Sequence, residues 1–272
     1  MTHYDLYRML ELPAEVTEHL NTYKTYRTFQ MSEELKQRML CRETWDEAVN
    51  ELQNLLEDDL YGFKLLYEML DICCTYSYPK YEEIGITDDI FVATMKFITR
   101  FLEWHKEYHG EYKFTQGPWF PRQLSCIEFR VGALEYELVA GETKEIAMHI
   151  PSDAVFDRIS VLDSLKEFAK FRDTFFPEWK NAVFTCETWM LAPAMEDILN
   201  GTSNVLAYKH LFDLDMIDDE ATWFMGFIFP GHSGEVETLP ERTSLQKKIK
   251  EMLLSGKKIG VAKGHLKEEY IV

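Results

Sequence analysis

The spacing of apolar residues changes near Gly117-Pro118, and this change constrains the fold more than any other feature of the 272-residue sequence. Before it, apolar residues recur every three or four positions, which is the period of an amphipathic helix. After it, short segments of strand character alternate with helical stretches. We therefore predict a helical N-terminal domain over residues 1–113 and a mixed α/β domain over residues 114–272.

The first part carries start signals for several helices. Ser32 precedes two glutamates, which is the arrangement of an N-cap followed by acids that interact favourably with the helix dipole. Residues 44–47 have the spacing of a capping box. Thr87 is a further candidate N-cap, ahead of an apolar face that begins at Phe91. We expect about five helices, packed as an irregular bundle.

The second part contains the strands. Its pattern predicts strands over residues 124–131, 134–139, 144–150, 182–190, 204–212, 222–229 and 257–263. Helical spacing predicts helices over residues 157–176 and 193–199, and Thr243 with Gln246 has capping-box spacing at the start of another. The first strands form an antiparallel start. The long helix between the third and fourth strands predicts a parallel pair joined by a right-handed crossover.

Acidic residues outnumber basic ones by 47 to 29, which gives a formal net charge of −18. A field of this sign repels phosphate backbones and anionic lipid surfaces, so nucleic-acid and membrane partners are disfavoured. The charge favours a cationic small molecule, such as an amine, although solubility alone also explains it.

The cellular compartment is predicted from what the sequence lacks. No stretch approaches 18 apolar residues without a charge, so no membrane-spanning helix is expected. The N-terminus lacks the basic and then apolar order of a signal peptide. The five cysteines are odd in number and contain no C-x-x-C pair, which disfavours both a disulfide framework and a zinc site. We therefore expect a cytoplasmic protein that binds no metal.

Several motifs of the second part point to one family. They are His149-Ile150-Pro151, Phe175-Phe176-Pro177, Cys186-Glu187-Thr188-Trp189, Thr202-Ser203-Asn204-Val205 and Thr243-Ser244-Leu245-Gln246. With them, the chain resembles a bacterial acyltransferase-domain family that has a helical N-terminal domain and a GNAT-like C-terminal domain. The resemblance implies an α+β fold, in which the helical domain precedes a GNAT-like mixed α/β domain with a central, mostly antiparallel twisted sheet.

The resemblance also implies how an acyl-CoA binds. In the GNAT superfamily two neighbouring parallel strands splay apart, and the pantetheine arm of the acyl-CoA enters the gap. Here those strands are residues 145–150 and 182–190. The pyrophosphate rests on backbone N–H groups at a helix N-terminus, which implies Ile150, Ser152 and Ala154 as cofactor-binding residues. Acetyl-CoA or a longer acyl-CoA is the expected co-substrate.

The loop at residues 150–157 departs from the usual phosphate loop. It contains no glycine, Pro151 lacks an N–H donor, and Asp153 and Asp157 place negative charge where the anion is expected. These features favour an alternative, in which a catalytically inactive GNAT-like protein binds or senses a small molecule or a protein without turning it over.

Three residues are candidates for catalysis. His149 ends a strand beside the expected splay, and imidazole titrates near neutral pH, so it is a candidate general base. Glu128 shares a strand face with Arg130, and the pair could organise the substrate in a cleft. Tyr208 is a candidate acid for the leaving thiolate. Each has a structural alternative: His149 fixing the turn at Pro151, Glu128 with Arg130 holding the domain junction, and Tyr208 packing in a strand.

Three further residues are candidates for substrate binding. Cys186 could accept an acyl group, and Glu187 with Trp189 could form an acidic and aromatic wall for a cation. The alternatives are a buried packing cysteine and an ordinary core and rim. Glu135 and Glu137 share a strand face as well and are interpreted as solvated.

The resemblance therefore implies an acyl-CoA-dependent N-acyltransferase. It moves an acyl group from an acyl-CoA to an unidentified small-molecule acceptor, with amines as the favoured class. The prediction depends on one structural premise, which is an open splay between two neighbouring parallel strands.

Overall fold

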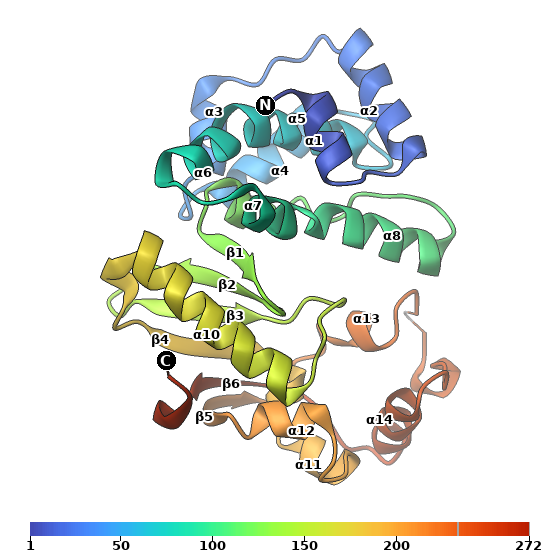
Figure 1. The fold of residues 1–272 in the computed structure, drawn as a ribbon. Helices are drawn as coiled ribbons and strands as arrows, with labels where there is room; N and C mark the ends of the chain where they lie inside the picture. Colours follow the sequence, from blue (N-terminus) through green and yellow to red (C-terminus); the bar gives the residue numbers. More distant parts are fainter. Residues whose placement is uncertain (233, 272) are drawn as a thin grey trace. The chain divides into compact units, whose positions relative to one another are not determined.

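The computed structural model describes residues 1–232 and 234–271, and it divides into two compact units, Met1–Val131 and Gly132–Val272 (Figure 1). The first unit consists mainly of helices. The second is built from a twisted sheet with helices packed on it.

The helices of the first unit are shorter and more numerous than the sequence predicts. Those described are α1 (His3–Met9), α2 (Ala14–Tyr26), α3 (Glu33–Met39), α4 (Trp45–Leu55), α5 (Phe63–Ile72), α6 (Tyr78–Ile84), α7 (Asp88–Met95), α8 (Phe97–His109) and α9 (Pro121–Leu124). Ser32 caps α3 as predicted, since its hydroxyl accepts a hydrogen bond from the Leu35 N–H at 3.1 Å. Thr44 does not cap α4, because its hydroxyl donates instead to the carbonyl of Arg38.

Among the described residues, six strands form one sheet. They are β1 (Glu128–Val131), β2 (Leu134–Val139), β3 (Glu145–His149), β4 (Val183–Thr188), β5 (Phe212–Asp218) and β6 (Val261–Leu266), and their order across the sheet is β1-β2-β3-β4-β6-β5. The pairs β2–β3, β4–β6 and β5–β6 are antiparallel, whereas β3–β4 is parallel. The mostly antiparallel sheet and the parallel pair around the long helix are both confirmed.

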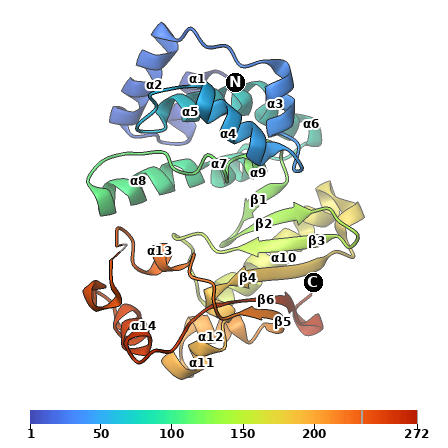
Figure 2. The ribbon, with the colours of Figure 1, turned by 180° about the vertical axis from the view of Figure 1, so that it is seen from behind.

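Helix α10 covers one face of this sheet. The helices of the second unit are α10 (Arg158–Phe175), α11 (Ala194–Ile198), α12 (Asn204–Lys209), α13 (Met225–Ile228) and α14 (Ser244–Leu254). α10 lies in front of the sheet in Figure 1 and behind it in Figure 2. The ring of Tyr136, on β2, stacks on Phe168 of α10 at 3.9 Å, and its hydroxyl lies 2.9 Å from Ser164 Oγ. Because strand side chains alternate, the neighbours of Tyr136 point to the opposite face.

That opposite face is polar. The register places Ala147 beside Thr185 and Thr185 beside His265, so these three side chains share it. On the same face, Glu145 Oε2 accepts hydrogen bonds from Lys263 Nζ at 2.8 Å and from Thr185 Oγ1 at 3.1 Å. Charged and hydrogen-bonding groups therefore extend across the middle strands of the sheet.

Two predicted strands are wrong. Residues 204–212 form α12 and the first residue of β5, and residues 222–229 include the short helix α13. Leu206 and Tyr208 are both buried at a spacing of two, which imitates the alternation of a strand. The true strand β5 lies between the two predicted ones, and after its first residue it is exposed, so its sequence lacks an apolar alternation.

Two other strands are displaced from their predicted positions. Residues 124–131 begin with the end of α9, and β1 starts only at Glu128. The last strand covers residues 261–266 instead of 257–263. In the second case Gly260, at φ 69°, delays the extended backbone.

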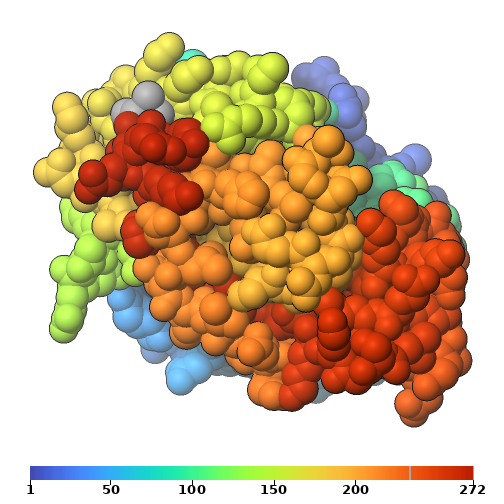
Figure 3. Space-filling model, turned by 90° about the horizontal axis from the view of Figure 1, so that it is seen from below, coloured from blue at the N-terminus to red at the C-terminus, as the bar shows by residue number. Residues whose placement is uncertain are grey.

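A hydrophobic cluster, here called the second core, joins the segments after β4 to α14. Its buried members are Trp189, Met195, Ile198, Leu206, Phe224, Ile228, Phe229, Leu239, Ile249, Ile259 and Val261. Thr243 and Gln246 form the predicted capping box at the start of α14. From below, the surfaces of α11 and α12 (light orange) lie beside that of α14 (orange-red) in Figure 3. None of the described helices combines the length and the apolar composition needed to cross a membrane.

Candidate active site

The parallel strands β3 and β4 separate partway along their length. They pair over three residues of each strand, from Glu145 with Val183 to Ala147 with Thr185. Beyond that point β3 pairs only with β2, whereas residues 186–188 of β4 pair with β6. Among the described residues, the carboxyl-terminal ends of β3 and β4 thus have no ladder bonds to each other. This is the splay on which the sequence-based prediction depends.

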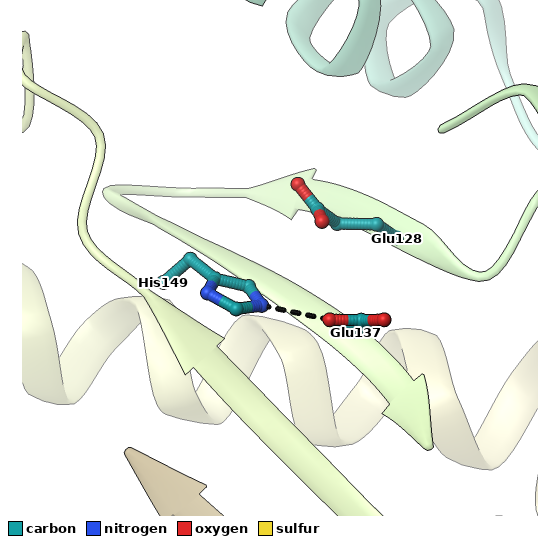
Figure 4. A group of neighbouring side chains, drawn as sticks. All are labelled: Glu128, Glu137 and His149. Carbon is teal, nitrogen blue, oxygen red and sulfur yellow. Dashed lines mark hydrogen bonds and ion pairs between the residues drawn. The ribbon is translucent and has the colours of Figure 1, made fainter. Parts of the chain in front are cut away.

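His149 is the last residue of β3, at the edge of this splay. Its Nε2 lies 3.0 Å from Oε2 of Glu137, and the imidazole is about a quarter exposed, whereas the carboxylate is almost completely buried. Figure 4 shows the bond between the two side chains. An ionised carboxylate can only accept, so Nε2 donates and Nδ1 carries the lone pair of the neutral ring. In catalytic triads, a histidine that is oriented by a carboxylate in this way acts as a general base.

Glu137 was interpreted as solvated, and that interpretation is wrong. Both Glu135 and Glu137 are buried. The register of β2 with β3 brings them onto the face that carries His149, with Glu135 directly opposite it. The sequence carried only part of this signal: a strand pair can bring acids of the first strand beside a histidine of the second, but the register decides which acid becomes the partner.

Glu128, on β1, is completely buried. Its Oε1 accepts a hydrogen bond from Gln123 Nε2 at 2.7 Å and a longer one from Trp119 Nε1 at 3.4 Å. Arg130, two residues further along β1, is partly buried, and its backbone N–H donates to Thr94 Oγ1 at 2.9 Å. Bonds from α9 and its preceding turn therefore fix the direction of the Glu128 carboxylate.

Glu128, Glu137 and His149 belong to three consecutive strands of the sheet, and Figure 4 draws them together. One possible ligand atom of each lies within 4.8 Å of those of the others. Carboxylates and imidazole are also ligands of zinc and iron. Since His149 Nε2 and Glu137 Oε2 are hydrogen-bonded to each other, we interpret the group as an acid–base arrangement.

Tyr208 lies on helix α12, not on a strand as predicted, and its side chain is buried beside Cys186. Cys186 is the first residue of β4 beyond the last pair with β3. Burial raises the pKa of the Cys186 thiol to about 12, and burial together with the neighbouring Cys186 raises the pKa of Tyr208. Both groups are therefore protonated at neutral pH. This argues against Cys186 as a nucleophile and leaves Tyr208 with a proton to donate.

Glu187 and Trp189 do not share one face. β4 ends at Thr188, and Trp189 begins a 3-10 turn, so the strand alternation stops between them. Trp189 is buried in the second core, where its ring lies 6.4 Å from that of Phe224. Glu187 remains exposed on the polar face of the sheet.

The loop after β3 is closed by its own residues. The N–H of Ala154 donates to the carbonyl of Pro151 at 3.0 Å, which engages one of the donors predicted for a phosphate. Asp157 Oδ1 accepts from the N–H groups of Ile159 at 2.8 Å and Ser160 at 3.0 Å. Hydrogen bonds from Ser160 are the main cause of a lowered pKa at Asp157. A carboxylate of the protein thus occupies the N-terminus of α10.

The other two predicted donors of this loop are the N–H groups of Ile150 and Ser152. Ile150 directly follows β3 and is partly buried, whereas Ser152 is exposed. Both follow the carboxyl-terminal end of β3.

Two known domain families together match nearly the whole chain. Residues 1–126 match the N-acyltransferase N-terminal domain, and residues 128–266 match the GNAT-like C-terminal domain. Among curated proteins, none matches the sequence significantly.

Solved structures of acyltransferases have the same fold. One, in complex with decanoyl-CoA and teicoplanin, is 20% identical, with a TM-score of 0.74 over 97% of this chain and 86% of that chain. Another, in complex with decanoyl-CoA, is 20% identical, with a TM-score of 0.76 over 97% and 86%. A mutant in complex with octanoyl-CoA is 20% identical, with a TM-score of 0.75 over 97% and 87%.

Proposed function

This chain belongs to the family defined by the GNAT-like C-terminal domain, and we propose that, as an acyltransferase, it moves an acyl group from an acyl-CoA to the amine of a small-molecule acceptor. The observation that carries the proposal is the separation of β3 and β4 after Ala147 and Thr185, with His149 at its edge. The acyl-CoA complexes of proteins with this fold support the choice of donor.

The reaction requires one proton to be removed and another to be supplied. The acceptor nitrogen attacks the thioester carbonyl, a C–N bond forms, and the C–S bond breaks to release the thiolate of CoA. His149, oriented by Glu137, takes the proton of the attacking amine. Glu128 and Arg130 organise the acceptor, and Arg130 supplies a charged donor for it.

We assign the second proton to Tyr208. It approaches β4 from the side of α12, beside Cys186, whereas His149 lies on the polar face of the sheet. A base and an acid on opposite sides of the splay suit a reaction in which the amine and the leaving thiolate separate in opposite directions. The phenol is protonated at neutral pH and can donate a hydrogen bond to the thiolate as it forms; once it has given up its proton, solvent must replace that proton before the next turnover.

The alternative of an inactive binding protein is favoured by one observation. Asp157 caps α10 with its own carboxylate, where a phosphate of CoA would otherwise accept the same N–H groups. In that case the splay holds a ligand that lacks a pyrophosphate, and no acyl group is transferred.

Thermal-shift titration with CoA, acetyl-CoA and decanoyl-CoA separates the two functions. A ligand at 100 times its Kd stabilises the native state by about 2.7 kcal/mol. For the transferase, we expect a rise in Tm with an acyl-CoA and the release of free thiol when an amine such as phenethylamine is added. If no acyl-CoA raises the Tm at millimolar concentration, the acyl-CoA proposal fails.

The role of His149 is tested with a matched histidine. His149→Gln should keep the shift in Tm and lose transfer at least about 100-fold. His210→Gln changes an exposed histidine that is bonded to Glu196 and should leave transfer unaltered. Equal loss in both variants would reject His149 as the base.

A further inference from the structure

The segment after β5 carries two large aromatic side chains that the second core does not cover. Trp223 is 53% exposed and Phe227 is 60% exposed, although rings of this size are usually buried. They lie four residues apart on the same side of the α13 segment, with their rings 6.2 Å apart and nearly perpendicular. Together they form one exposed aromatic surface, the Trp223–Phe227 platform.

The platform is held in place from beneath. Phe224, Ile228 and Phe229 of the same segment are buried in the second core. Gln246, on α14, donates from Nε2 to the carbonyl of Ile228 at 2.8 Å in a buried position. The residues that face inward are therefore already fixed, and the platform cannot turn into the core without displacing them.

The second core also links the segment that carries the platform to the end of β4. β4 ends at Thr188, Trp189 follows directly, and the ring of Trp189 stacks beside that of Phe224 with 29° between their planes. Phe224 adjoins Trp223 in the chain. These contacts connect the platform, through Phe224 and Trp189, to the end of the strand that forms one side of the splay.

Three carboxylates precede the platform in the chain. Asp218, Asp219 and Glu220 end β5 or follow it, and all three are exposed. Glu220 forms an ion pair with Lys258. In the described part of the chain, no basic side chain lies within ion-pair distance of Asp218 or Asp219. The faces of aromatic rings attract cations, and nearby carboxylates add to that attraction.

We propose that the Trp223–Phe227 platform binds the acceptor, and that the acceptor combines an aromatic or other apolar body with a protonated amine. The proposal rests on the proposed function, in which an acceptor amine is acylated at the splay. The acyl chain of a donor would gain binding affinity from the rings but none from Asp218 and Asp219. The combination of rings and carboxylates therefore favours a cationic acceptor.

Fluorescence anisotropy of dansylcadaverine tests the proposal without turnover, because this probe has an aromatic body and a primary amine. Trp223→Ala and Phe227→Ala should each raise its Kd at least about tenfold, which corresponds to about 1.4 kcal/mol. Trp223→Phe should recover part of the affinity. Ile159→Ala, a matched change at a side chain 74% exposed on α10, should have no effect. Asp219→Asn should weaken dansylcadaverine but not dansylamide, which lacks the amine.

Three results would overturn the proposal. The first is no binding of dansylcadaverine to the unaltered protein, and the second is unchanged binding in the platform variants. The third is a Trp223→Ala protein that loses affinity for decanoyl-CoA but not for the probe, which would assign the platform to the acyl chain. Titration with acyl-CoA distinguishes failure of the proposed function from failure of this proposal. If the proposed function is wrong, acyl-CoA does not bind although dansylcadaverine still does.

Discussion

Nε2 of His149 lies 3.0 Å from Oε2 of Glu137, although the two residues are twelve positions apart and on different strands. The antiparallel register of β2 and β3 produces this pair, because Glu137 lies opposite Ala147 and His149 follows on the same face. The buried carboxylate fixes the tautomer and the orientation of the imidazole at the edge of the splay.

Glu137→Gln tests what this pair contributes to catalysis. Glutamine keeps an oxygen that accepts a hydrogen bond but removes the negative charge that stabilises an imidazolium. We expect kcat for acyl transfer to fall about 10- to 100-fold, with the KM for the acyl-CoA unchanged. Steady-state kinetics at saturating amine measure both constants.

Glu135→Gln is the matched control for this change. Glu135 is buried on the same strand and face, directly opposite His149 in the register. A loss of kcat in Glu135→Gln as large as that in Glu137→Gln would show that the buried acids act through folding or general electrostatics, and not through the bond to His149.

Tyr208→Phe tests the proton supplied to the leaving thiolate. Removing the hydroxyl should lower kcat about tenfold or more with an alkyl thioester, whose thiol has a pKa near 8.5. A donor with an aryl thiol as leaving group needs less protonation and should be almost unaffected. Tyr136→Phe removes another buried hydroxyl, which lies beside Ser164. It should not change the ratio of the two rates, and a change as large as that in Tyr208→Phe would argue against the proton donor.

The elements predicted correctly are those whose signal is local. Strands β2, β3 and β4 and helix α10 each have a regular apolar period and a clear end, such as Pro177 after α10. The same holds for the caps at Ser32 and Thr243, which require only a side chain and a backbone N–H three residues later. Such features depend little on the rest of the chain.

The prediction failed where the environment decides the structure. α12 was predicted as a strand because Leu206 and Tyr208 are buried at a spacing of two, although Leu206 packs in the second core and Tyr208 lies against Phe212. β5 lies at the edge of the sheet and exposes both of its faces, so burial imposes no alternation on its sequence.

The candidate site was predicted in part. His149 and its splay were predicted from the resemblance, and the register then shows that Glu137 completes the pair. Cross-strand partners cannot be identified until the turn length and register are known. Trp223 was missed because it lay in a predicted strand, where an aromatic residue is expected to be buried.

The reactivity of the five cysteines tests the burial of side chains in the native protein without any substitution. Cys41 is exposed, whereas Cys73, Cys74, Cys126 and Cys186 are buried. Burial raises the pKa of the last three of these to about 12, so at pH 8 only about one in 10,000 of such groups is a thiolate. We expect one thiol per chain to react with DTNB in the native protein and five after denaturation. Rapid reaction of a second thiol under native conditions would show that one of these sites is open to solvent.

Substitutions of Asp157 test its role as the cap of α10. Asp157→Ala should lower the Tm at pH 7, whereas Asp157→Asn should restore most of it, because asparagine also accepts from the backbone. The pKa of Asp157 is lowered in the folded state, so its charge stabilises the fold above the ordinary carboxyl pKa, and this contribution is lost as the pH falls through the folded value. The difference between the protein and Asp157→Asn should therefore disappear in acid, as thermal melts from pH 7 to pH 3 would record.

Asp157→Asn also decides whether the phosphates of the donor reach the N-terminus of α10. Asparagine removes the charge that repels an anion there, so the Kd for CoA should fall about 3- to 10-fold at low ionic strength, and the gain should shrink in salt as screening increases. S-decanoyl-N-acetylcysteamine has no phosphate and should bind both proteins equally. Asp163→Asn, a change on α10 at a carboxylate paired with Lys166, should leave the affinity for CoA unaltered. Unchanged affinity for CoA in Asp157→Asn would mean that the phosphates bind elsewhere, and absent binding of CoA to every variant would favour the inactive alternative.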